Sequence, residues 1–155
     1  MINVATILPK VVNSEDTRDY LTATVIDGLE ILKKENKINL IFASLDSIEA
    51  VRSCDLIILL SSKNGTDYSL AELIDRWNKT VFVDGSEFGK NNRLDVTLQK
   101  KLVAGTYEGR GAINKDMLQK CSLYFRREKP YLNNIIPLPF GIEKRYIKYK
   151  PETKN

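Results

Sequence analysis

Residues Leu56 to Leu60 form an unbroken run of Leu and Ile, and this run limits the folds open to the chain more than any other feature. A strand that is apolar on both sides must be buried on both sides, as a central strand of a parallel sheet is. Other largely apolar runs rich in β-branched and aromatic residues predict further strands at Ile2–Leu8, Ile38–Ala43, Thr80–Val83, Ser122–Phe125 and Ile135–Leu138.

Segments with helical spacing separate these runs. The clearest is Asp16–Lys34, where apolar residues recur every three or four positions. Further helices are predicted at Asp46–Arg52, at Tyr68–Trp77, around Leu94–Leu102 and around Ile113–Leu118. Alternating strands and helices predict an α/β fold: a three-layer Rossmann-like domain with a mainly parallel sheet and helices on both faces. Rossmann-like and flavodoxin-like strand orders both stay open.

The chain of 155 residues contains no histidine. This excludes Ser-His-Asp and Cys-His catalysis and imidazole metal sites, so proton transfer would fall to carboxylates, lysine or tyrosine. Cys54 and Cys121 lack metal-ligand spacing, which predicts free thiols and no metal site. GxGxxG and GxxxxGK[ST] are both absent, so we expect no bound nucleotide cofactor.

The formal net charge is +4, and part of the excess lies in basic clusters at 126–129 and 144–150. Such clusters attract nucleic acid, anionic lipid or phosphorylated ligands, but they are also typical of a solvated surface. The scattered tyrosines offer no stacking platform, so a nucleic-acid partner is not expected, whereas a peripheral membrane contact stays open. No apolar run approaches the roughly 18 residues of a membrane span, and no signal peptide is visible, which predicts a cytoplasmic protein.

Asp84-Gly85-Ser86-Glu87 follows a predicted strand, where the carboxyl ends of parallel strands border a binding crevice. Asp84 and Glu87 are the candidate catalytic carboxylates, acting as a general base or holding a sugar hydroxyl, and Ser86 is a candidate substrate contact. In the alternative interpretation, Asp84 only caps the turn with an Asx hydrogen bond.

Tyr124-Phe125-Arg126-Arg127-Glu128 ends another predicted strand. Arginine has a planar fork suited to phosphate or carboxylate, so Arg126, Arg127 and Glu128 are candidate substrate-binding residues. Side chains alternate along a strand, so only one of the two arginines should point into the crevice. An arginine paired with Asp84, Glu87 or Glu128 as a structural bridge is the alternative.

Pro137-Leu138-Pro139-Phe140-Gly141-Ile142-Glu143 is a stiff run in which Gly141 permits an unusual backbone angle and is a further candidate for substrate binding. The run could be a hinge or an apolar loop packed on the domain. The segment Ser61–Gly65 could donate hydrogen bonds into the same crevice, but we interpret it as a turn, and Thr106–Gly111 as a surface loop.

Taken in order, the Asp84, Tyr124 and Pro137 segments resemble the N-terminal domain of GT-B-type glycosyltransferases of bacterial surface-polysaccharide assembly. The resemblance implies that residues 1–147 form the acceptor-side domain and bind a sugar or glycan. It further implies that 148–155 is a linker or tail toward a missing second domain that would bind the nucleotide-sugar. Alone, such a domain should not transfer sugar.

Two other classes stay open. One is a flavodoxin-like or receiver-like binding or signalling module, although Leu8-Pro9-Lys10 and Leu60-Ser61-Ser62 lack the acidic residues that a receiver needs. The other is a small nucleoside-processing transferase that would use Asp84 and Glu87.

Overall fold

The computed structural model describes residues 1–9, 20–62, 66–86, 96–104, 106–109, 111–126 and 134–138. These residues form a six-stranded sheet in the order β2-β1-β3-β4-β5-β6, and every neighbouring pair is parallel. The strands are β1 Ile2–Ile7, β2 Ile38–Phe42, β3 Leu56–Ser61, β4 Thr80–Asp84, β5 Leu123–Arg126 and β6 Ile135–Pro137. All of the predicted strands are therefore present, with ends shifted by at most one residue.

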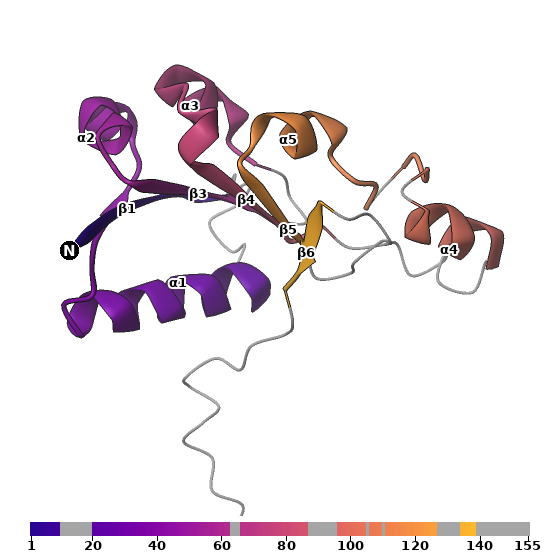
Figure 1. Cartoon of the computed structure of the whole chain (residues 1–155), viewed down its shortest axis with the longest axis horizontal. Helices are drawn as coiled ribbons and strands as arrows, with labels where there is room; N and C mark the ends of the chain where they lie inside the picture. Colours follow the sequence, from indigo (N-terminus) through magenta and orange to yellow (C-terminus); the bar gives the residue numbers. More distant parts are fainter. Residues whose placement is uncertain are drawn as a thin grey trace, which may run out of the picture.

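The helices lie on both faces of the sheet (Figure 1). They are α1 Tyr20–Lys34, α2 Ile48–Arg52, α3 Tyr68–Ile74, α4 Val96–Val103 and α5 Lys115–Lys120, with 3-10 turns at Leu45–Ser47 and Trp77–Lys79. Helix α1 covers one face and α2, α3 and α5 cover the other, while α4 stands apart at the end far from the N-terminus. The predicted three-layer α/β architecture is confirmed, and its strand order is the flavodoxin-like one of the two that stayed open.

Each face of the sheet has its own apolar core. On one face, Ile57 and Leu59 pack with side chains of α2, α3 and α5. On the other, Ile58 and Leu60 pack with Leu21, Ile26 and Leu29 of α1. Strand β3 is thus buried on both sides, which is why its sequence does not alternate between apolar and polar residues.

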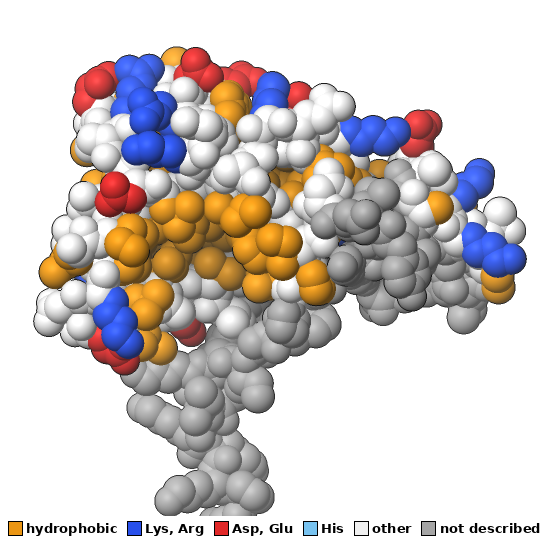
Figure 2. All heavy atoms as spheres, viewed as in Figure 1, with side chains coloured by type: hydrophobic (Ala, Val, Ile, Leu, Met, Phe, Trp, Pro, Cys, Tyr) orange, Lys and Arg blue, Asp and Glu red, His pale blue; other side chains and the backbone are white. Residues whose placement is uncertain are grey.

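Many charged side chains lie on the outer surface of the helices (Figure 2). In Figure 2 an apolar band is visible at the level of the sheet, and lysine, arginine, aspartate and glutamate gather on the helices above it. None of the helices in the described part of the chain is long and apolar enough to cross a bilayer.

Candidate functional site

A row of polar side chains crosses the carboxyl end of the sheet. Ser61 of β3 is in register with Asp84 of β4, and Asp84 is in register with Arg126 of β5. Residues in register on adjacent parallel strands point to the same face, here the face covered by α3 and α5. We call Ser61, Asp84 and Arg126 the polar row. All three side chains are buried, so each polar atom must find a partner inside the protein.

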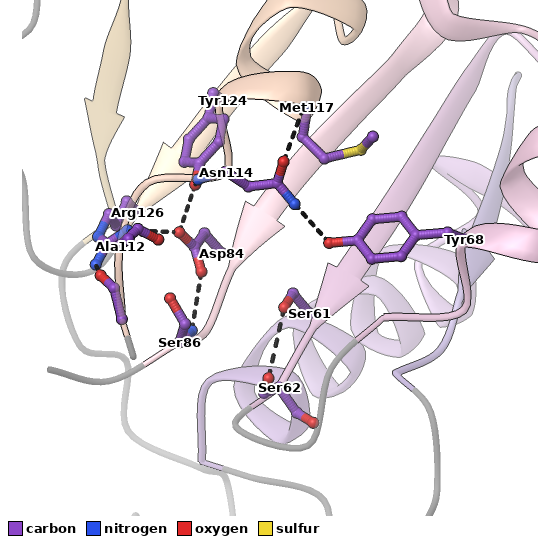
Figure 3. A network of polar contacts seen from close by, with 11 residues as sticks. Ser61, Ser62, Tyr68, Asp84, Ser86, Ala112, Asn114, Met117, Tyr124 and Arg126 are labelled. Atoms are coloured by element: carbon purple, nitrogen blue, oxygen red, sulfur yellow. Dashed lines mark hydrogen bonds and ion pairs between the residues drawn. The ribbon is translucent and has the colours of Figure 1, made fainter. Parts of the chain in front are cut away.

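The Asp84 carboxylate has a partner for each oxygen (Figure 3). Its Oδ2 accepts hydrogen bonds from the Tyr124 hydroxyl at 2.5 Å and from Arg126 Nη1 at 2.8 Å. Its Oδ1 accepts one from the backbone N–H of Ser86 at 2.9 Å. The structure thus contains both the Asx hydrogen bond and the arginine bridge, which were the structural alternatives for this segment. The catalytic role of Asp84 stays a prediction.

Tyr124 acts as a neutral donor in this site. Burial, followed by the charge of Asp84 and the hydrogen bond to it, raises the pKa of Tyr124 well above its ordinary value of 10.0. The hydroxyl therefore stays protonated and donates a hydrogen bond to Asp84 Oδ2. The same oxygen accepts the backbone N–H of Asn114 at 3.2 Å.

Arg126 also holds the backbone of the segment before α5. Its guanidinium donates to the carbonyl oxygens of Gly111 and Ala112, in addition to Asp84. The side chain is completely buried, at 0% exposure. Arg126 is therefore committed to protein groups at Nη1 and Nη2, and its role in substrate binding stays a prediction.

The loop around Tyr107 is not fully exposed. Tyr107 is buried, and Gly109 has a φ of +143° with room beside it only for hydrogen, because a Cβ there would lie 2.6 Å from the Tyr107 hydroxyl oxygen. The N–H groups of Thr106 and Tyr107 donate to the Lys101 carbonyl, and Arg126 donates to the Gly111 carbonyl, so both ends of the loop are hydrogen-bonded. The sequence predicted a surface loop here, but it did not predict the burial of Tyr107 or the hydrogen bond from Arg126 to Gly111.

Asn114 extends the network to helix α3. Its side-chain oxygen accepts the Met117 N–H at 3.1 Å and so caps the start of α5. Its amide nitrogen donates to the Tyr68 hydroxyl on α3 at 2.6 Å. Hydrogen bonds thus link α3, β4, β5 and the start of α5 into one network (Figure 3). The sequence did not point to Tyr68 and Asn114 as site residues. Polar residues are common in loops and at helix starts, so nothing in the local pattern distinguishes these two.

A second region lies where the strand order reverses. The chain runs from β1 outward to β2 and then returns past β1 to β3, so β1 and β3 flank the topological switch point. Ligands of open α/β sheets bind in the crevice at this point, beyond the carboxyl ends of the strands. Here those ends are Leu8, Ser61 and Ser62.

Three buried polar atoms near the carboxyl edge lack a hydrogen-bond partner in the described part of the chain. They are Thr66 Oγ1, after β3, Ser86 Oγ, after β4, and Arg126 Nε. Buried polar groups are normally paired, so such atoms need an explanation, and a ligand is one. Thr66 was not identified from the sequence, since a threonine five residues past a strand is unremarkable until the switch point is known.

The structure brings three of the predicted site residues together: Asp84, Ser86 and Arg126. As alternation requires, Arg126 points to the face of Asp84. Glu87, Arg127, Glu128 and Gly141 lie outside the described residues, as does the proposed linker 148–155. Burial raises the pKa of Cys121 to about 11, which keeps this thiol protonated and disfavours it as a nucleophile. Across the described ranges, no group of three or more acidic or cysteine side chains could hold a metal ion.

Comparisons of the chain with protein-family models, with curated proteins and with solved structures find no match in any of the three.

Proposed function

We propose that this chain is the acceptor-side domain of a glycosyltransferase, with a sugar or glycan bound at the carboxyl edge of the sheet. The observation that carries the proposal is the polar row, in which the Asp84 and Tyr124 segments of the resemblance meet at one point. A cytoplasmic location and a nucleotide-sugar supplied by a second domain belong to the same proposal.

The chemistry of the edge favours a hydroxyl-rich ligand. Arg126 is already neutralised by Asp84, whereas the unpartnered atoms include the hydroxyls of Thr66 and Ser86. Hydroxyls donate and accept at once, as sugar hydroxyls do, so the two match each other. In this proposal Asp84 positions the turn that carries Ser86, and Glu87 remains the candidate to orient or deprotonate the acceptor hydroxyl.

The test is whether the isolated chain binds a saccharide. Binding is measured by saturation-transfer NMR with a panel of neutral and anionic oligosaccharides. We expect at least one saccharide to bind, and Thr66→Val and Ser86→Ala to weaken that binding. The exposed residue Leu45 provides a control, since Leu45→Ala should leave binding unchanged. Failure of every saccharide to bind, or turnover of a nucleotide-sugar by this chain alone, would contradict the proposal.

The strand order supports a second candidate, a flavodoxin-like binding module or a small nucleoside-processing transferase. FMN titration and a nucleoside base-exchange assay separate these from the first candidate. Loss of exchange activity in Asp84→Asn or Glu87→Gln would favour the transferase.

A further inference from the structure

The two outer edges of the sheet differ in their protection against pairing with another strand. Strand β6 has only three residues and ends in Pro137, which has no N–H to donate. Strand β2 has five residues, Ile-Asn-Leu-Ile-Phe, without proline or charge. In the described part of the chain, β1 is the neighbour of β2 on one side and no strand lies on the other. An edge of this kind is a template for strand addition.

The backbone of β2 presents a regular set of free groups to this outer side. The Ala43 N–H donates to the Thr6 carbonyl of β1 at 2.9 Å, so odd-numbered residues in this segment face β1. Backbone direction alternates along a strand, and the even-numbered residues Ile38, Leu40 and Phe42 therefore direct their N–H and C=O groups outward. Such groups are strong donors and acceptors that gain from pairing.

A groove of about 400 Å³ lies beside this edge, between the last turns of α1 and β2. Its lining combines apolar side chains with charges of both signs: Glu30, Lys33, Lys34, Asn36, Leu40 and Phe42. Phe42 is 39% exposed although it is aromatic, and it points to the same face as Leu40.

We propose that β2 pairs antiparallel with β2 of a second copy of this chain, around a two-fold axis at Leu40. In this register Leu40 faces its counterpart and Phe42 faces Ile38 of the other copy. Every outward N–H and C=O of the strand then finds a partner. The Phe42 ring of each copy is buried beside the groove of the other, and the two sheets become one.

The charges of both signs around the groove favour a second copy as the partner. A two-fold interface must be self-complementary, because the same patch lies on both sides. The two α1 helices run antiparallel across such an interface, so that Glu30 of one copy faces Lys33 and Lys34 of the other. An unrelated strand would satisfy the backbone of β2 but would have no reason to carry this complementary pattern.

Sedimentation equilibrium over a range of concentrations tests the proposal. We expect a concentration-dependent dimer of the 17.7 kDa chain, and a dissociation constant raised by about tenfold or more in Phe42→Glu, which buries an unpaired charge. Leu45→Glu is the matched control, because Leu45 is 70% exposed and does not line the groove. Glu30→Lys and Lys34→Glu should each weaken the dimer, and mixing these two variants should restore it.

Hydrogen exchange of the unmodified chain gives a readout that does not depend on any variant folding. The amides of Leu40 and Phe42 should become protected as concentration rises, whereas those of Asn39 and Ile41, which face β1, should be protected throughout. Any of three results would overturn the proposal. They are a monomer at all concentrations, an unchanged dissociation constant in Phe42→Glu, and protection of the Leu40 and Phe42 amides that does not change with concentration.

Discussion

The carboxyl ends of β4 and β5 differ sharply from those of β1 and β3. At β4 and β5 the space is filled by the protein's own Asp84, Tyr124 and Arg126, which satisfy one another. At or beyond the carboxyl ends of β1 and β3 the described chain has Leu8, Ser61, Ser62 and Thr66, of which Thr66 Oγ1 lacks a partner among the described residues. The charged motif at β4 and β5 is therefore largely committed to protein groups, and only Ser86 Oγ and Arg126 Nε lack a partner there in the described chain. The quieter region at β1 and β3 contributes Thr66 Oγ1.

A buried ion pair explains this division of roles. Removing two charges from water costs free energy that their attraction recovers only with good geometry and additional hydrogen bonds. Asp84 and Arg126 have both, through Ser86, Tyr124 and the Gly111 carbonyl. We infer that the pair mainly specifies where the surrounding loops lie.

The largest predicted effect comes from breaking the pair. Arg126→Met should lower the free energy of unfolding by about 3–5 kcal/mol, because Asp84 is left charged and buried without its partner. Urea denaturation measures the loss. The double variant Asp84→Asn/Arg126→Met should recover part of it, and a single variant that loses less than about 1 kcal/mol would be typical of an exposed pair instead.

Tyr124→Phe tests the neutral donor of the same network. At neutral pH it should cost about 1.5–3 kcal/mol, the range for a hydrogen bond to a charged group. The unfolded tyrosine ionises near pH 10, whereas the folded one keeps its proton to higher pH, so wild-type stability falls as pH rises above 10. The difference between variant and wild type should therefore narrow above pH 10. A constant difference would show that Tyr124 titrates alike in both states.

Gly109→Ala tests the loop that Arg126 holds. Its backbone conformation is one that L-residues rarely adopt, and the added methyl meets Tyr107, so we expect a loss of about 1–3 kcal/mol. Gly28→Ala is the matched control. Gly28 is within α1 with nothing near the new methyl, so this variant should gain about 0.5–1 kcal/mol. Thermal denaturation measures both changes in stability. Equal changes in the two variants would mean that the backbone at Gly109 is not fixed in this conformation.

The smallest effect on stability is expected at the quieter region. Thr66→Val removes a buried hydroxyl without a partner and keeps the shape, so stability should change by less than about 1 kcal/mol, toward stabilisation. The same variant should lose affinity for the saccharide that the wild type binds. A marked loss of stability would instead indicate that the hydroxyl has a structural role.

Much of the architecture could be predicted from local patterns. The spacing of Leu21, Val25 and Leu29 predicted α1, and the unbroken Leu56–Leu60 run predicted a strand buried on both sides; both predictions are confirmed. These features depend on residues a few positions apart. The functional assignment, which rests on short segments and their resemblance, stays a proposal.

The sequence by itself determined the helices, the strands and their parallel layering, because burial of an apolar stripe or run requires no knowledge of distant partners. Only the tertiary structure decided that Arg126 pairs with Asp84 and not with a nearby acid, that β2 is left at an open edge, and that the switch point lies between β1 and β3. The physical reason is that strand order and buried polar contacts join residues far apart in the chain. Their free energy depends on geometry that exists only once the sheet has formed.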